Sequence, residues 1–141
     1  MKVENIMTRE VITCSPHDSV LTVAKQMKEH GIGALPVVAK QEVQGIITDR
    51  DIIIRCVATR EDPTESHVSD CMTRNPVSCT PETDEFAASE IMAQNQVRRL
   101  PVLRNRQLMG IISLGDLARQ HNNAYETGEA LQEIADPSPL H

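Results

Sequence analysis

The chain contains two short motifs in which a hydroxyl residue is followed three positions later by an aspartate. Thr48 precedes Asp51 and Ser113 precedes Asp116, each directly after a glycine-led aliphatic run. This spacing is typical of a capping box, in which the hydroxyl and the carboxylate bond free backbone N–H groups at a helix start. The same groups also suit a ligand, because a carboxylate accepts hydrogen bonds from sugar hydroxyls and a helix start favours phosphate. Both interpretations predict a turn between a strand and a helix.

Two adjacent arginines form a second candidate site. Arg98 and Arg99 directly precede an apolar run, where burying them without an anion would be costly. The forked guanidinium group matches the oxygens of phosphate, so we interpret the pair as an anion site, with a solvated loop as the alternative. The corresponding positions in the first half of the chain are Gly33 and Ala34. We therefore expect two ligand sites that differ in charge.

These motifs recur because the chain repeats itself. A shift of 65 residues aligns residues 3–53 with 68–118 without a gap. The shared residues include Met7/Met72, Thr8/Thr73, Cys14/Cys79, Pro36/Pro101, Gly45/Gly110 and Asp51/Asp116. A single copy of about 55 residues buries little surface and would be only marginally stable alone. We expect the copies to share a core and to leave two clefts between them for a ligand.

Each copy is expected to fold as β-α-β-β-α, an α/β (α+β) arrangement repeated with pseudo-twofold symmetry. In the first copy Val20, Val23, Ala24 and Met27 form an apolar stripe with helical spacing, which Asp18 or Ser19 caps and Gly31 ends. The second copy has a weaker stripe, Phe86, Ala88, Ile91 and Met92. The second helices are expected to start at Asp49 and Leu114. The expected organisation is repeat 1 at 1–58, a polar linker at 59–67, repeat 2 at 68–120 and a tail at 121–141, helical near 129–135.

Composition excludes several classes of function. The 141 residues include 14 basic and 20 acidic ones, a net charge of −6, and 1% are aromatic, which argues against nucleic-acid binding. The aliphatic runs are too short to span a bilayer, and the N-terminus lacks a secretory signal, so we expect a cytoplasmic protein. No C-x-x-C occurs among the four cysteines, so we expect free thiols and no metal site, a redox or zinc site with a histidine being the alternative. The motifs of common hydrolases and phosphate-binding enzymes are absent, which predicts a non-enzymatic protein.

The repeated pattern resembles a known family. Each copy has an M-T motif, then L-P-V, then G-h-h-T/S-x-x-D, where h is an apolar residue, and this order is similar to the cystathionine-β-synthase (CBS) domain. Two in tandem make a CBS pair, or Bateman module. The resemblance covers residues 3–118 and is strongest to stand-alone two-CBS proteins of bacteria, including the hypoxic-response type. It implies a regulatory protein that binds an adenosine-containing ligand (AMP, ADP, ATP, NAD or S-adenosylmethionine) and requires no other cofactor.

The resemblance also implies which residues bind the ligand. Asp51 and Asp116 would accept the ribose hydroxyls, with Thr48 and Ser113 bonding ribose or phosphate. In the family each cleft combines the acid of one copy with the first strand of the other. The first cleft is expected to contain Thr48, Arg50, Asp51, Pro76, Val77, Arg98, Arg99 and Pro101. The second is expected to contain Val11, Ile12, Ala34, Pro36, Ser113 and Asp116.

The second helices also predict an interaction surface. Ile52–Ile54 is apolar on more than one helix face, and the related helix carries Leu117 and Ala118. We expect two chains to pack through these helices as a homodimer, with an unidentified protein partner receiving the signal. The alternative function is a scaffold or interaction protein whose clefts are empty or vestigial.

Overall fold

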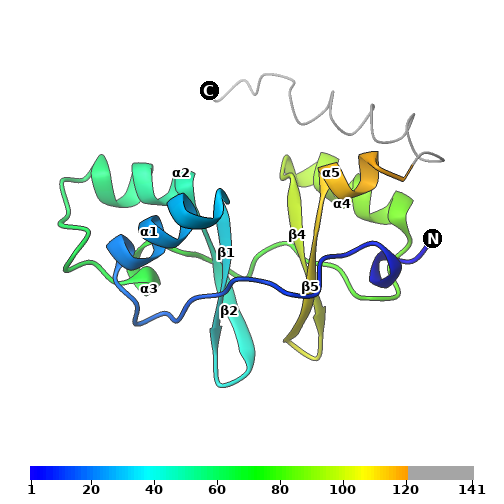
Figure 1. Cartoon of the computed structure of the whole chain (residues 1–141), viewed down its shortest axis with the longest axis horizontal. Coiled ribbons are helices and arrows are strands. Elements are labelled where there is room, and N and C mark those ends of the chain that lie inside the picture. The colour runs from blue at the N-terminus through cyan, green and yellow to red at the C-terminus, as the bar shows by residue number, and fades with distance from the viewer. Residues whose placement is uncertain (121–141) are drawn as a thin grey trace. The chain divides into compact units, whose positions relative to one another are not determined.

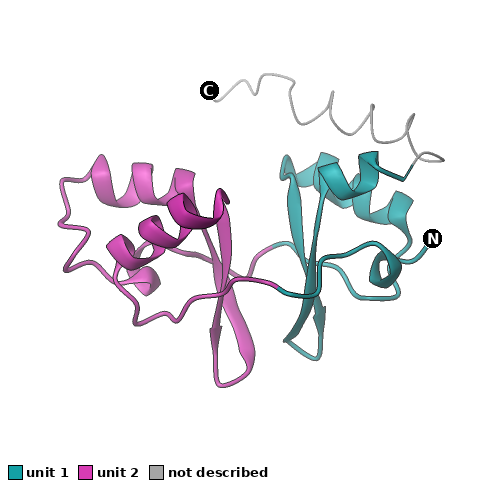
Figure 2. Cartoon of the chain, in the orientation of Figure 1, with its two compact units in different colours: residues 1–10, 77–141 teal, residues 11–76 magenta. Residues whose placement is uncertain are grey.

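The computed structural model of the protein describes residues 1–120 and divides the chain into two compact units (Figure 2). Unit 2 contains residues 11–76, and unit 1 contains residues 1–10 together with the chain from residue 77 onward. The helix predicted near residues 129–135 lies outside the described residues. Within residues 1–120, no helix combines the length and the apolar character needed to cross a membrane.

Helix α1 (Val20–His30) of unit 2 begins and ends where the sequence predicts. The Ser19 hydroxyl accepts a hydrogen bond from the Thr22 amide at 3.1 Å, as expected of an N-cap. The helix ends at Gly31, whose φ of 64° is the left-handed conformation that glycine adopts without strain. Val20, Val23 and Met27 are buried in the core, which confirms the predicted stripe.

The sheet of unit 2 has three strands in the order β1-β2-β3. β1 (Ala34–Ala39) and β2 (Glu42–Thr48) form an antiparallel hairpin, and the short β3 (Thr73–Arg74) pairs antiparallel with β2. The extended segment that precedes α1 adds a parallel bridge between Cys14 and Val37. Helices α1 and α2 (Asp49–Ile52) lie on one side of the β1–β2 hairpin (Figure 1). α2 continues directly into a π-helical turn, Ile53–Val57, and α3 (Val68–Cys71) precedes β3.

Unit 1 repeats this arrangement with α4 (Glu85–Asn95), β4 (Arg99–Arg104), β5 (Gln107–Ser113) and α5 (Leu114–Ala118). Cys79 makes a parallel bridge to Val102, as Cys14 does to Val37, and this bridge is the first β element of each unit. Both units therefore have the predicted β-α-β-β-α order. The predicted stripe of α4 is wrong at Phe86, whose residue surface is 41% exposed. Ala88 and Met92 of the predicted stripe are buried in the core, together with Ala93. Phe86 lies two residues, or about 200°, from Ala88 on the helix.

In both units the third strand position is filled by the first segment of the other repeat. Thr8 pairs with Ile111 in unit 1, and Thr73 pairs with Ile46 in unit 2. The residues between the repeats also belong to unit 2, where the Val20 amide bonds the Ser66 carbonyl at 2.9 Å. The compact units are therefore offset from the sequence repeats by the length of this first segment.

The predicted role of Leu117 in dimerisation is wrong. Leu117 is fully buried in the core of unit 1, because α5 packs that side chain between α4 and the sheet. In unit 2, by contrast, Ile53, Ile54 and Val57 are 57%, 51% and 61% exposed. An exposed apolar surface therefore exists on the π-helical turn and has no counterpart at Leu117.

Candidate functional site: two aspartate turns

The turn between β2 and α2 contains the predicted capping box. The Thr48 hydroxyl accepts a hydrogen bond from the Asp51 amide at 3.1 Å, and Asp51 Oδ2 accepts one from the Thr48 amide at 2.9 Å. These two bonds satisfy amides that the first helical turn leaves without a partner. The Asp51 side chain is 12% exposed, so its carboxylate lies at the surface edge of the turn with restricted access to water.

The second oxygen of Asp51 is not used by the cap. The Thr73 hydroxyl donates to Asp51 Oδ1 at 3.2 Å, and Arg55 Nε lies 4.0 Å from the same oxygen. Arg55 comes from the π-helical turn and also donates from Nη1 to the Met72 carbonyl at 2.8 Å. Asp51 is therefore linked both to its own helix and to the segment that contains α3 and β3.

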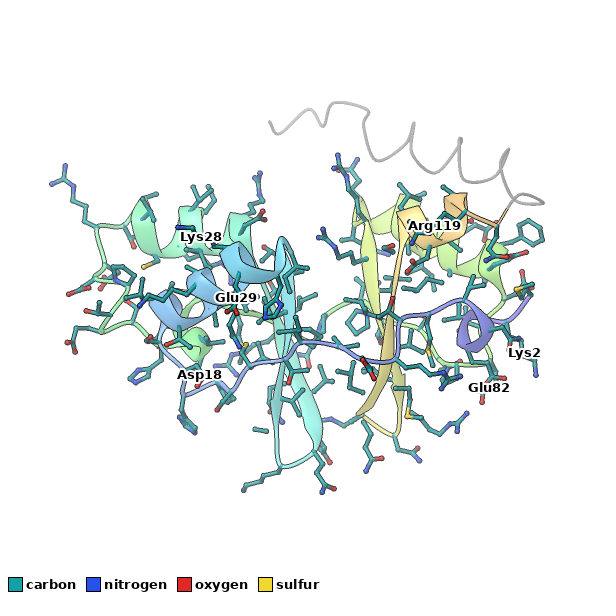
Figure 3. The ribbon with its side chains drawn as sticks, viewed as in Figure 1. Lys2, Asp18, Lys28, Glu29, Glu82 and Arg119 are labelled. Atoms are coloured by element: carbon teal, nitrogen blue, oxygen red, sulfur yellow. The ribbon has the colours of Figure 1, made fainter. Side chains whose placement is uncertain are left out.

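The turn between β5 and α5 has the same capping box. The Ser113 hydroxyl accepts from the Asp116 amide at 3.0 Å, and Asp116 Oδ2 accepts from the Ser113 amide at 2.9 Å. Asp116 Oδ1 pairs with the guanidinium group of Arg119, which lies at the end of α5 (Figure 3). The Asp116 side chain is 12% exposed, as is that of Asp51, so both aspartates have the same cap and burial but a different partner for Oδ1.

Each turn leaves its aspartate with unused hydrogen-bonding capacity. An ionised carboxylate has about four acceptor positions. The capping box and the Oδ1 partner use two of them at each turn. Two acceptor positions on one fixed carboxylate match two neighbouring hydroxyl groups of a ligand.

The two turns have different charged neighbours. The Arg98 carbonyl accepts from the Leu114 amide at 2.8 Å, and Arg99 pairs with Ser113 in the β4–β5 ladder. The predicted arginine pair therefore lies beside the turn of Asp116 along the backbone of its own unit. The side chains of Arg98 and Arg99 are exposed, and within residues 1–120 they have no ion-pair partner.

In unit 2 the corresponding space is occupied by a second acid. Gly33 takes the place of Arg98, and its carbonyl accepts from the Asp49 amide at 2.9 Å. A Cβ at Gly33 would lie 2.9 Å from Asp49 Oδ2, so the absence of a side chain leaves room for that carboxylate. The Asp51 turn consequently has two carboxylates and Arg55, whereas the Asp116 turn has one carboxylate and Arg119, with the backbone of Arg98 and Arg99 beside it.

The remaining predicted site residues are divided between the units. Unit 2 contains Val11, Ile12, Ala34, Pro36, Thr48, Arg50, Asp51 and Pro76. Unit 1 contains Val77, Arg98, Arg99, Pro101, Ser113 and Asp116. Ala34 is buried opposite Thr48 in the β1–β2 ladder, whereas Arg50 is exposed. The grouping of residues from both units into one cleft stays a prediction.

Sequence reasoning missed four residues that the structure places at the turns. Asp49, Arg55 and Thr73 lie at the Asp51 turn, and Arg119 lies at the Asp116 turn. Thr73 had a usable signal, because it is identical to Thr8 in the repeat alignment. Arg55 and Arg119 had a local signal, because they follow Asp51 and Asp116 by four and three residues, the spacing at which side chains of one helix meet. The repeat alignment gave no such signal, because their counterparts are Gln120 and Ile54.

The cysteines are unsuited to chemistry at these turns. All four are free and buried. Burial raises the pKa of the Cys14 thiol to about 12, with a smaller contribution from Asp18, and burial raises the pKa of Cys79 to about 11. Such thiols stay protonated and unreactive at neutral pH. Within residues 1–120 no group of three or more histidine, cysteine, aspartate or glutamate side chains could hold a metal ion.

Comparison with known sequences identifies the repeat. The sequence profile of the CBS domain matches residues 3–57 and again 68–122. The chain belongs to the CBS-domain family. The CBS domain-containing protein YhcV of Bacillus subtilis is 40% identical over 133 residues, which cover 94% of each chain. This CBS pair is thus similar to a relative of nearly the same length.

Solved structures of CBS proteins have the same fold. Hypoxic Response Protein I, determined with two coordinated zinc ions, has a TM-score of 0.78 and 30% identity, covering 85% of this chain and 98% of that one. The CBS domain pair of MJ0100, determined in complex with 5′-methylthioadenosine and S-adenosyl-L-methionine, has a TM-score of 0.77 and 25% identity. The alignment with MJ0100 covers 88% of this chain and 98% of that one. Both alignments confirm the tandem CBS fold.

Proposed function

We propose that this CBS pair is a non-enzymatic regulatory module that binds an adenosine-containing ligand of the AMP, ADP, ATP, NAD or S-adenosylmethionine class. Binding would change the state of the module, which passes that change to a protein partner. The proposal assigns the ribose to the aspartate turns and requires no additional cofactor.

The observation that carries the proposal is the unused acceptor capacity of Asp51 and Asp116. Each carboxylate is fixed by its capping box, and each side chain is 12% exposed. A carboxylate that is already oriented and partly shielded from water binds a vicinal diol with little loss of side-chain freedom. The same arrangement occurs in both copies of the repeat. MJ0100, a CBS pair of the same fold, has been determined with two adenosyl ligands.

The proposal includes the site residues that the family resemblance implies. The Asp51 group consists of Thr48, Arg50, Asp51, Pro76, Val77, Arg98, Arg99 and Pro101. The Asp116 group consists of Val11, Ile12, Ala34, Pro36, Ser113 and Asp116. The arginines would bond phosphate oxygens, and the apolar residues would pack on the adenine.

The experiment is a thermal-shift panel of AMP, ADP, ATP, NAD and S-adenosylmethionine, followed by calorimetric titration of the ligands that shift the melting temperature. A ligand that binds only the folded state adds about 2.7 kcal/mol of stability at a hundredfold excess over Kd. Asp51→Asn and Asp116→Asn keep an oxygen for the capping box but remove the charge that attracts the diol. Each variant should lose the binding of its own site.

Asp49→Asn is the matched control, because it makes the same charge change two residues before Asp51. It should bind the ligand as the wild type does. If Asp51→Asn and Asp116→Asn both keep wild-type affinity, the ribose assignment is wrong. If no ligand of the panel shifts the melting temperature, the alternative of a scaffold with empty sites is favoured.

We also propose that two chains associate through the exposed apolar surface of Ile53, Ile54 and Val57. These side chains lie on one π-helical turn of unit 2, and an exposed apolar cluster of this kind is typical of an interaction surface. Sedimentation velocity should give a dimer for the wild type and a monomer for Ile54→Asp. Phe86→Asp, which introduces the same charge at an exposed apolar residue of unit 1, should remain dimeric. A monomeric wild type at micromolar concentration would exclude this assembly.

A further inference from the structure

We infer that Thr73 and Arg55 are positioning residues for Asp51 and that they link ligand binding at this turn to the chain segment 68–76. The inference rests on the proposed function, because it assumes that Asp51 accepts hydrogen bonds from a ligand. It adds a regulatory connection that belongs to one of the two turns. The repeat does not predict it, since the counterpart of Arg55 in the second repeat is Gln120.

The connection is a continuous set of polar contacts within unit 2. Asp51 Oδ1 accepts from the Thr73 hydroxyl at 3.2 Å and lies 4.0 Å from Arg55 Nε. Arg55 Nη1 in turn donates to the carbonyls of Met72 at 2.8 Å and Cys71 at 3.3 Å. The guanidinium group thus contacts both the carboxylate and the residues immediately before Thr73.

The contacts of Arg55 also explain why it takes this position. Cys71 ends helix α3, and the last carbonyls of a helix have no partner within it. A cation at a helix C-terminus bonds these carbonyls and is attracted to their partial negative charge. The π-helical turn that follows Asp51 carries Arg55, so the irregular turn presents the arginine to both partners.

A ligand would add to this set of contacts rather than replace it. Oδ2 of Asp51 is fixed by the Thr48 amide and Oδ1 by the Thr73 hydroxyl, which leaves about two acceptor positions for a diol. Without the Thr73 bond, the Oδ1 atom has one fixed partner fewer and the carboxylate rotates more freely. Ligand binding and the ordering of segment 68–76 should therefore favour each other, and such coupling is reciprocal.

The Asp116 turn lacks this connection. Thr8 is the repeat counterpart of Thr73 and pairs with β5 through its backbone, but within residues 1–120 its hydroxyl makes no hydrogen bond to Asp116. Asp116 Oδ1 pairs with Arg119 of its own helix instead. A ligand at Asp116 would therefore leave the segment 1–10 unaffected by this route.

The test uses Thr73→Val, which removes the hydroxyl and keeps the shape of the side chain. It is made in an Asp116→Asn background, so that only the Asp51 turn binds. With S-adenosylmethionine and AMP as probes, calorimetric titration should show about tenfold weaker binding for Thr73→Val. Thr8→Val is the matched control and should bind as the parent does, and Thr73→Ser should restore affinity to within about twofold.

Hydrogen exchange supplies the second measurement. In the parent protein the probe should slow amide exchange in residues 68–76, and Thr73→Val should lose this protection even at saturating probe. Arg55→Met should speed exchange of the same residues without any probe, whereas Arg60→Met, an exposed arginine after the π-helical turn, should not. Circular dichroism of each variant verifies that it is folded.

The outcomes separate this inference from the proposed function. If Asp51→Asn abolishes binding while Thr73→Val binds normally, or if the probe leaves exchange in residues 68–76 unchanged, the inference is wrong and the proposed function stands. If neither probe binds the parent, the inference is wrong for this turn. If no ligand of the thermal-shift panel binds the wild type, or if Asp51→Asn has no effect on binding, the proposed function fails and the inference fails with it.

Discussion

Replacing Gly45 with alanine should destabilise unit 2 and weaken the Asp51 turn together. Gly45 lies in β2 opposite Arg74 of β3. A Cβ at this position would lie 2.5 Å from the backbone oxygen of Thr73 and 3.1 Å from Met72 Sδ. The methionine side chain can move aside, but the carbonyl oxygen belongs to a strand and moves only with it.

The size of the effect follows from this contact. Ordinary contacts of a Cβ begin at 3.4 Å, so β3 must move by about 1 Å. Overpacking of this kind costs about 1–3 kcal/mol. Replacing a glycine also stabilises the protein by about 0.4–1 kcal/mol, because alanine restricts the unfolded chain. Loss of the Thr73–Asp51 bond adds roughly 1 kcal/mol. We expect a net loss of about 2 kcal/mol in the free energy of unfolding, or a melting temperature lower by roughly 8 °C.

Urea denaturation of Gly45→Ala, Gly110→Ala and Gly31→Ala measures this prediction. A Cβ at Gly110 would lie 2.7 Å from the Thr8 carbonyl oxygen. Gly110→Ala should therefore be destabilised to a similar degree without weakening ligand binding at Asp51. Gly31 has open space around its Cβ position, and its φ of 64° alone should cost about 1 kcal/mol. If Gly45→Ala is no less stable than Gly31→Ala, the close approach of β3 to β2 is not the reason for glycine at this position.

Three further variants test other parts of the structure. Ser19→Ala should lower the free energy of unfolding by about 1 kcal/mol in urea denaturation, because it removes the N-cap bond of α1. Arg119→Met should change stability by less than about 0.5 kcal/mol, since an ion pair with an exposed partner is weak; a larger loss in the same assay would mean that Arg119 supports the fold. The raised pKa values of Cys14 and Cys79, about 12 and about 11, mean that the folded chain keeps both thiols protonated above pH 9 while the unfolded chain loses the protons. Stability should therefore be unaffected below pH 9 and fall from pH 9 to pH 11, and a Cys14→Ala/Cys79→Ala variant should show a shallower fall in denaturation curves recorded across this range.

Local residue patterns predicted much of the fold and the caps of the candidate site. The stripe of Val20, Val23 and Met27 placed helix α1, and Gly31 marked its end. The Thr48–Asp51 and Ser113–Asp116 spacings predicted two capping boxes, both of which the structure contains. These features depend on neighbours within four residues, where the geometry of the backbone leaves few alternatives. The pattern failed at Phe86, where the weak stripe of α4 did not define which face is buried.

The internal duplication is visible in the sequence alone. It was enough to predict the family and the two equivalent turns. Arg55 and Arg119 follow their aspartates by four and three residues, so helical spacing in the sequence already indicates these two ion pairs. The contact of Asp51 with Thr73 was decided only by tertiary structure. Thr73 contacts Asp51 because the first segment of repeat 2 pairs with strand β2 of unit 2. The two residues are 22 positions apart in the chain. Spacing in the sequence carries no information on such long-range contacts, since they depend on how strands and helices pack after each has formed.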